Sequence, residues 1–175
     1  MTSAPLIRIA RAADLAAIDA LFARSYGRLL AADYPPSIRV TAIPLLSRAQ
    51  PRLVTSGRYY VAVGAEGTIL GAGGWSPAGP GQEADPLPEA ADVGRAHVRH
   101  LVTDAGHTRR GIGRALMGRV FAEARTAGIH RLDCLATRTA VPFYSALGFV
   151  TLGPVEVALR PGIDFPAIRM QRLLE

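Results

Sequence analysis

The sequence has 175 residues, of which 49% are hydrophobic, so it is long enough to bury a core as one domain, which we expect to span residues 1–175. Its formal net charge is +6, but all twenty basic residues are arginines scattered without a long run, which does not favour nucleic acid as a partner. The sequence has neither an apolar run of the roughly 20 residues that span a bilayer nor the apolar block of a signal peptide, so we expect a cytoplasmic protein with no membrane partner.

The first half of the chain predicts a strand, a helix, two shorter helices and a hairpin. Residues 6–11 alternate apolar and basic side chains as a half-buried strand does, and residues 15–22 have the apolar spacing of a helix. Two prolines interrupt the helical spacing of residues 37–55, which favours two short helices. The β-rich runs at residues 58–63 and 68–75 flank a glycine-containing turn and predict adjacent antiparallel strands.

The second half predicts a long loop followed by alternating strands and helices. Residues 76–94 are so rich in proline and glycine that we expect a flap, meaning a loop beside a binding site. Beyond the flap we predict a strand over 96–104, a helix over 111–126, a strand over 131–136, a short helix over 140–147, and strands over 149–159 and 168–173. This order indicates an α/β chain with at least one right-handed crossover unit.

The turn between the strand at 96–104 and the following helix has the composition of an anion-binding site. Gly111 and Gly113 flank Ile112 at the start of the helix, where free backbone N–H groups and the helix dipole attract an anion. Positive charge around the turn comes from Arg109, Arg110 and Arg114. We therefore predict that a pyrophosphate binds here.

Two common phosphate motifs compete with this interpretation. A P-loop is excluded because the sequence contains no lysine. The dinucleotide-binding fingerprint fits Gly111 and Gly113, with Asp133 about twenty residues further on, but Leu116 stands in place of its third glycine and Asp133 lies inside its strand. We rank this fingerprint below coenzyme A binding.

From Thr108 to Gly113 the sequence resembles the cofactor motif of the GNAT superfamily of N-acetyltransferases, Gln/Arg-x-x-Gly-x-Gly/Ala, with Thr108 in the first position. Residues 137–149 are similar to the second cofactor motif of that family, a short helix that carries Phe-Tyr and ends in Gly-Phe. Here Thr137 stands where many members have Asn. With the order of the elements, the resemblance covers the chain from about Tyr59 onward.

The resemblance implies a mixed, mostly antiparallel sheet that opens between the strand ending near Asp104 and the strand around Leu132, with acetyl-CoA bound in the cleft. The backbone of Leu101, Val102 and Thr103 would bind the pantetheine arm and polarise the thioester carbonyl. The other cofactor-binding residues that it implies are Thr108, Arg109, Arg110, Gly111, Ile112, Gly113, Arg114, Thr137 and Phe143.

The resemblance also implies that Tyr144 protonates the departing coenzyme A sulfur, since a phenol can supply a proton to a thiolate. The alternative is a packed aromatic side chain. For the base we choose His97, because histidine titrates near neutral pH and the two-residue period of a strand places it on one face with Arg99 and Leu101. The same period points His100 to the other face. A merely structural His97 is an equal alternative, and the acids of the flap, Glu83, Asp85 and Glu89, compete for the role.

Several other side chains have two interpretations each. Arg99 would bind an acidic group of the acceptor or form a structural ion pair, and Trp75 would form a wall of the acceptor pocket or belong to the core rim. We expect His107 and His130 to be solvated in turns. Cys134 is expected to be a buried thiol, and the histidines and acids show no metal-binding spacing, so we predict no metal.

We therefore expect an enzyme, an acetyl-CoA-dependent N-acetyltransferase that transfers the acetyl group directly to a primary amine of a small molecule, peptide or protein. A non-catalytic acyl-CoA-binding sensor is the alternative. A third hypothesis, an arginine-rich nucleic-acid binder, predicts affinity that falls steeply with salt. The sequence does not indicate the acceptor, and a homodimer remains open as the assembly state.

Overall fold

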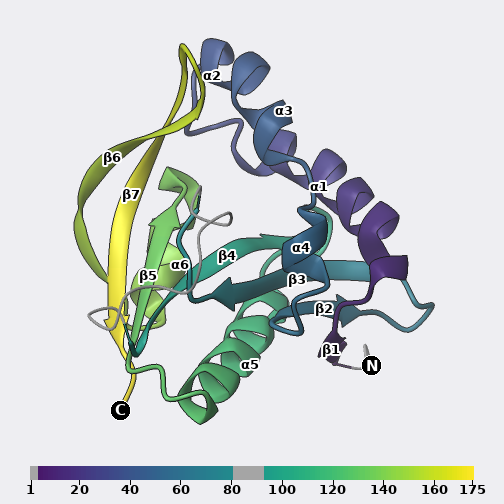
Figure 1. Cartoon of the computed structure of the whole chain (residues 1–175). Helices are drawn as coiled ribbons and strands as arrows, with labels where there is room; N and C mark the ends of the chain where they lie inside the picture. The colour runs from purple at the N-terminus through teal and green to yellow at the C-terminus, as the bar shows by residue number, and fades with distance from the viewer. Residues whose placement is uncertain (1–3, 81–92) are drawn as a thin grey trace.

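The computed structural model describes residues 4–80 and 93–175 (Figure 1). Its strands are β1 (Leu6–Ile9), β2 (Tyr59–Val63), β3 (Ile69–Ser76), β4 (Arg95–Thr103), β5 (Arg131–Ala136), β6 (Val150–Arg160) and β7 (Ile163–Leu173). Its α-helices are α1 (Leu15–Leu29), α2 (Pro36–Thr41), α3 (Ile43–Leu46), α4 (Pro51–Val54), α5 (Ile112–Thr126) and α6 (Val141–Ala146). Single 3-10 turns, η1 (Ala12–Asp14) and η3 (Arg138–Ala140), precede α1 and α6.

The strands form one seven-stranded sheet in the order β1-β2-β3-β4-β5-β7-β6. All neighbouring strands are antiparallel except β4 and β5, which are parallel and are connected through α5. The structure confirms the predicted mixed, mostly antiparallel sheet and its β4–α5–β5 crossover unit. Helix α1 and the short helices α2 to α4 lie on one side of the sheet, and α5 lies on the other (Figure 1).

Helix α5 packs on the sheet through an apolar stripe on one of its faces. The buried residues of this stripe are Ile112, Leu116, Met117, Val120, Phe121 and Ala124. They share a core with Ala96 and Val98 of β4 and with Leu132 of β5. Burial of this face fixes the position of the amino end of α5 relative to β4.

Each short helix of the chain has a proline at its start. From the sequence we had expected two prolines only to interrupt the helical spacing of residues 37–55. Pro36, Pro44, Pro51 and Pro142 each occupy the first or second position of α2, α3, α4 and α6, respectively. Proline suits this position because its fixed φ matches a helix and its missing N–H has no partner there in any case. The prediction of two helices in residues 37–55 is therefore wrong, since three short ones are present.

The last two strands form a hairpin longer than predicted. Strand β7 begins at Ile163, and Pro166 pairs with Glu156 of β6 inside the ladder. The prediction missed this part of the strand because its polar residues and its proline do not fit the apolar pattern of a strand. The inward side chains Phe165 and Ala167 join a third core with residues of α1 to α3. No helix of the described residues has both the length and the apolar character needed to cross a membrane.

Candidate active site

A cleft opens where strands β4 and β5 separate. These strands pair only from Arg95 to His97 on β4 and from Arg131 to Asp133 on β5, and beyond these residues they diverge. A cavity of about 590 Å³ lies at this opening, lined by residues of both strands, of α1 and α6, and of the β6–β7 hairpin. The structure thus places the opening of the sheet where the family resemblance implies it.

A bulge in β4 changes which side chains face each side of the sheet. The pairing with β3 shifts between Ala72 opposite Val102 and Gly74 opposite Arg99, and His100 has a left-handed φ of 43°. As a result, Arg99 and His100 both contact the side chain of Gln50. The prediction that His100 points away from the face of Arg99 is wrong, because strict alternation fails at a bulge.

The amino end of α5 forms a cradle of backbone N–H groups. Gly111 caps the helix with a φ of 79°, and Arg109 before it has a φ of 65°, so the chain turns through two left-handed residues into the helix. The first N–H groups of a helix have no partner inside it, and the dipole is positive at this end. The side chains of Arg109, Arg110 and Arg114 are exposed around it. This geometry suits a pyrophosphate.

Gly113 brings the two cofactor motifs into contact. A Cβ atom added at Gly113 would lie 3.1 Å from two carbons of the Phe143 ring, which is closer than an ordinary van der Waals contact. With a larger residue here, the Phe143 ring or the first turn of α5 would have to shift by a few tenths of an ångström, so glycine suits this close approach. Phe143 in turn meets Tyr144 edge to face, with ring centroids 5.2 Å apart.

Tyr144 lies buried on the wall of the cavity and faces a buried thiol. It is 5% exposed, and its hydroxyl interacts with the thiol of Cys134. Burial raises the pKa of Tyr144 well above its usual value, and the nearby Cys134 adds to this rise, so the phenol keeps its proton at neutral pH. Cys134 is buried, as predicted, and burial raises the pKa of its thiol to about 12, which favours the protonated form.

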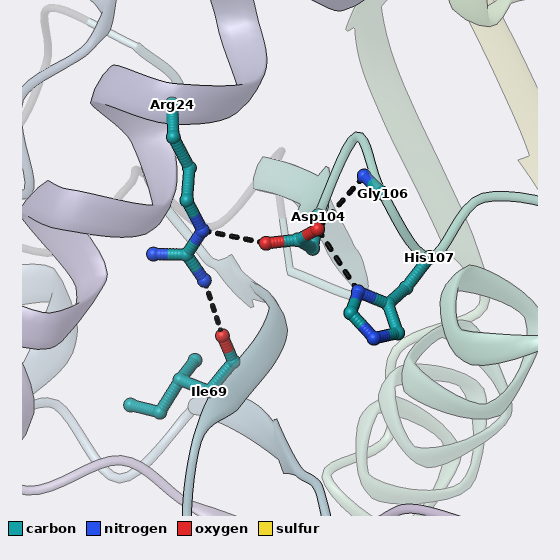
Figure 2. Close-up of polar contacts among 5 residues, drawn as sticks. All are labelled: Arg24, Ile69, Asp104, Gly106 and His107. Carbon is teal, nitrogen blue, oxygen red and sulfur yellow. Dashed lines mark hydrogen bonds and ion pairs between the residues drawn. The ribbon is translucent and has the colours of Figure 1, made fainter.

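Asp104, which sequence reasoning did not single out, fixes the turn that leads to the cradle. Its Oδ2 accepts a hydrogen bond from Arg24 Nε at 2.5 Å, and its Oδ1 accepts from the Gly106 N–H at 2.8 Å and contacts His107 Nδ1 at 3.0 Å (Figure 2). Arg24 also donates to the Ile69 carbonyl at 2.8 Å. The carboxylate therefore joins helix α1 to the β4–α5 turn, and Arg24 links both to strand β3.

The electrostatics of Asp104 favour its ionised form. Burial opposes ionisation, but the hydrogen bonds from His107, Arg24 and Gly106 outweigh it and lower the pKa of Asp104 to about 2. The sequence offered one signal, an Asp directly after a strand and two residues before a glycine, which is typical of an Asx turn. Its partner Arg24 is 80 residues away in sequence and could not be inferred. We had expected His107 to be solvated, but it contacts this carboxylate.

Most of the predicted cofactor residues lie around the cavity. Those that line it are Leu101, Val102, Thr103, Thr108, Gly113, Thr137 and Phe143, and the predicted acid Tyr144 lines it too. Thr137 also caps the turn before α6, because its Oγ1 accepts from the Ala140 N–H at 3.2 Å. Arg109, Arg110, Gly111 and Arg114 lie at the exposed amino end of α5, and Ile112 is buried beneath them.

His97 lies apart from this main cavity. It lines a second cavity of about 180 Å³, which shares Pro80, Cys134 and Leu135 with the larger one. The competing acids Glu83, Asp85 and Glu89 fall outside the described residues. Among the described residues, no three His, Cys, Asp or Glu side chains gather as a metal site would require.

Two further side chains have resolved positions. Trp75 is 4% exposed and belongs to the core beside α5, and its indole N–H donates to the Tyr60 hydroxyl at 3.3 Å. This supports the core position over the pocket wall. His130 is exposed, as expected for a residue in a turn.

Comparison with known proteins connects this geometry to one family. A sequence model described as the acetyltransferase (GNAT) family matches residues 15–149. No curated protein sequence matches the chain.

Similar solved structures extend over nearly the whole chain. A GCN5-related N-acetyltransferase from Rhodopseudomonas palustris is 20% identical, with a TM-score of 0.78 over 99% of this chain and 98% of its own. The yncA protein of Salmonella typhimurium, solved with its cofactor acetyl-CoA, is 19% identical, with a TM-score of 0.64 over 99% and 95%. A ribosomal-protein-alanine N-acetyltransferase from Brucella melitensis is 21% identical, with a TM-score of 0.63 over 97% and 99%. At these identities the likeness shows the fold.

Proposed function

Because the chain belongs to the GNAT acetyltransferase family, we propose that it is an acetyl-CoA-dependent enzyme that transfers an acetyl group directly to a primary amine. The acceptor would be a small molecule, a peptide or a protein. The observation that carries the proposal is the cavity of about 590 Å³ at the opening of the sheet, because its lining unites residues of both cofactor motifs. The similar yncA structure, which contains acetyl-CoA, also supports the choice of cofactor.

The residues present fit this cofactor. The backbone N–H groups from Arg109 to Gly113 and the arginines around them would hold the pyrophosphate, and the absent Cβ of Gly113 keeps the path past Phe143 open. Backbone groups of residues 101–103, where β4 leaves β5, would hold the pantetheine arm. Bound acetyl-CoA would supply the acetyl group as a thioester.

Two side chains of this chain would manage protons. The Tyr144 hydroxyl, which keeps its proton because burial raises its pKa, would donate toward the departing sulfur. His97 would accept the proton of the acceptor amine through water, since its cavity adjoins the main one at Pro80, Cys134 and Leu135. The apolar walls would exclude bulk water from the reacting groups.

Replacing Tyr144 by Phe tests the proposal most directly. We expect Tyr144→Phe to reduce turnover by about 10²–10⁴-fold, the usual contribution of a positioned general acid, and to leave acetyl-CoA affinity nearly unchanged. Tyr26→Phe is the matched control, because Tyr26 lines the same cavity and its hydroxyl has no hydrogen-bond partner within residues 4–80 and 93–175. Normal turnover in Tyr144→Phe would remove this residue from the mechanism.

An amine panel tests the enzyme itself. Release of free coenzyme A thiol with at least one primary amine is the expected result. Binding of acetyl-CoA without thiol release for any small-molecule, peptide or protein amine would overturn the enzyme proposal and favour the acyl-CoA sensor.

For the base, His97→Gln should lower turnover at neutral pH, whereas unchanged turnover would exclude His97 from the reaction.

A further inference from the structure

Two exposed arginines stand where the main cavity meets solvent. Arg48 follows α3 by two positions and Arg160 is the last residue of β6, and both line the cavity although their side chains are exposed. We call this opening the mouth of the cavity and define it by these two residues. The mouth therefore has a positive charge on the helical segment and another on the β6–β7 hairpin.

The cavity wall near the mouth is apolar. Ile43 and Leu46 of α3 share a core with Leu159 of β6 and Phe165 of β7, and the tip of the hairpin lies beside α2 and α3 (Figure 1). Leu46, Leu159 and Phe165 also line the cavity, as does Leu29 of α1. Residues of the two cofactor motifs line another part, so this apolar part remains for the acceptor.

No acid of the described residues neutralises the mouth. None of the residues that line the cavity is an aspartate or a glutamate. Within the part of the chain that the structure describes, neither Arg48 nor Arg160 has a hydrogen bond or an ion pair. Asp164, near the tip of the hairpin, lies opposite Ala158 in the ladder and forms no ion pair with Arg160. The positive charge is therefore available to a ligand.

A third arginine belongs to the wall of the cavity and not to its mouth. Arg99 lines the cavity but is only 2% exposed. Its Nη1 donates to Ser76 Oγ at 2.9 Å, and its Nη2 donates to Gln50 Oε1 at 3.1 Å. Because Arg99 has partners inside the fold, we assign recognition at the mouth to the two exposed arginines alone.

A positive mouth selects among amines by their charge. It repels a second ammonium group on an acceptor and attracts an anionic group, which also steers the acceptor toward the cavity. The cavity of about 590 Å³ has the size of a small-molecule site. An acceptor that places its amine at the thioester and spans the apolar wall would have its far end at this positive opening.

We propose that the acceptor is a small molecule with a primary amine at one end, an anionic group at the other and an apolar chain between them. The chain would lie along the apolar wall, and the anion would stay at the mouth, where Arg48 and Arg160 attract it. The inference rests on the proposed acetyltransferase function and names the substrate class of the same site. Arg48 and Arg160 are specificity-determining residues in this proposal.

Amines of matched length test the proposal, with release of coenzyme A thiol as the readout. One set consists of 6-aminohexanoate, hexylamine and 1,6-diaminohexane, and the four-carbon and eight-carbon sets are built in the same way. At low ionic strength, kcat/KM for the amino carboxylate should exceed that for the alkylamine by about tenfold in at least one set, with the diamine lowest. Because salt screens exposed charges, this preference should shrink to about twofold at about 0.5 M salt.

Substitution of the two arginines then assigns the preference. The double variant Arg48→Gln and Arg160→Gln should reduce the ratio of amino carboxylate to alkylamine to about twofold, mainly through KM. Arg48→Lys with Arg160→Lys keeps both charges and should retain most of the preference. Arg39→Gln with Arg52→Gln is the matched control, because it removes the same charge from exposed positions outside the cavity. The melting temperature and acetyl-CoA affinity of each variant are measured alongside.

A binding measurement separates recognition from turnover. Isothermal titration calorimetry in the presence of coenzyme A compares 6-acetamidohexanoate, an anionic product, with N-hexylacetamide, which lacks the anion. We expect the anionic acetamide to bind about tenfold more tightly at low ionic strength, and the double glutamine variant to lose this difference.

The outcomes distinguish this inference from the proposed function. Equal kcat/KM for the carboxylate and the alkylamine in every set, a preference for the diamine, or activity only on amines outside these sets overturns the inference and leaves the acetyltransferase intact. A preference that the double glutamine variant retains overturns the role of Arg48 and Arg160, and so does an equal loss of acetyl-CoA affinity, which would assign them to the cofactor. No thiol release with any amine overturns the proposed function, whereas tighter binding of the anionic acetamide would still support an anion-binding mouth.

Discussion

The part of the molecule that would bind the cofactor and the part that would bind the acceptor are built in different ways. In the cofactor half, formed by the end of β4, α5 and α6, the shape of the site depends mainly on the backbone. The backbone has left-handed φ angles at Arg109 and Gly111 and a close approach at Gly113. In the acceptor half, formed by α1 to α4 and the β6–β7 hairpin, side chains such as Leu46 and Phe165 line the cavity. A close backbone approach such as that at Gly113 favours glycine, whereas many apolar side chains can form a pocket wall.

The sharpest test of the cofactor half is to add a side chain at Gly113. Gly113→Val places a Cβ atom 3.1 Å from the Phe143 ring and crowds the amino end of α5. Because overpacking of such a contact costs about 1–3 kcal/mol and the cradle would be displaced, we expect acetyl-CoA affinity to fall about a hundredfold. Isothermal titration calorimetry with acetyl-CoA measures this change.

Gly118 supplies the control on the same helix. A Cβ added at Gly118 meets nothing within 4 Å, so Gly118→Val has the same helix propensity cost without the collision. Its acetyl-CoA affinity should stay within about twofold of the unaltered chain. Equal losses in the two variants would contradict the importance of the Gly113–Phe143 contact.

Asp104 joins the two halves, and we expect its removal to have the second-largest effect, on the free energy of unfolding. Its pKa lies near 2 in the folded chain against a usual 3.8, so its ionisation stabilises the fold by about 2 kcal/mol. Since the folded pKa is the lower one, this contribution is complete above about pH 4 and is lost as the pH falls toward 2. We expect Asp104→Asn to lower the free energy of unfolding by about 2 kcal/mol at pH 7 and by much less near pH 2.

Urea unfolding at both pH values measures this difference. Asp164→Asn is the control, because Asp164 is an exposed aspartate of β7 and its loss should change stability by less than about 0.5 kcal/mol. A constant difference between Asp104→Asn and the unaltered chain at both pH values would contradict the role of its charge.

The comparison of the two halves also explains how far the sequence could predict the structure. The strands up to β5 and helix α5 followed from apolar periodicity and from glycines at 111 and 113, because these signals are local, whereas the opening of the sheet was implied by the family resemblance. The bulge at His100 did not follow, since an extra residue in a strand leaves no mark on composition and reverses the expected faces. The links of Arg24 with Asp104 and of Gln50 with Arg99 join distant parts of the chain and needed the fold.

In the acceptor half, we expect loss of the Tyr34 hydroxyl to lower stability by a smaller amount and to leave acetyl-CoA affinity unchanged. Its hydroxyl accepts from the Arg138 N–H at 2.8 Å and donates to the Pro166 carbonyl at 2.9 Å, so it joins the segment after α1 to η3 and β7. Tyr34→Phe leaves both backbone groups without this partner and should lower the free energy of unfolding by about 1 kcal/mol. Chemical denaturation measures the loss, and a parallel loss of acetyl-CoA affinity would show that the two halves are not separable in this way.

The smallest expected effects concern the exposed arginines at the amino end of α5. Arg110 and Arg114 are exposed, so water and salt screen their attraction to a pyrophosphate, and each should contribute about 0.5–1 kcal/mol at low salt. The double variant Arg110→Gln and Arg114→Gln should therefore weaken acetyl-CoA binding by about tenfold at low ionic strength and by less at 0.5 M salt. Arg39→Gln is the single-charge control, because Arg39 is exposed on α2 in the acceptor half. If the double variant lost no more than twice the binding free energy that Arg39→Gln loses, net charge alone would explain the effect on acetyl-CoA binding. A larger loss would show that the positions of Arg110 and Arg114 matter, as the conformation of the glycines does in the same half of the molecule.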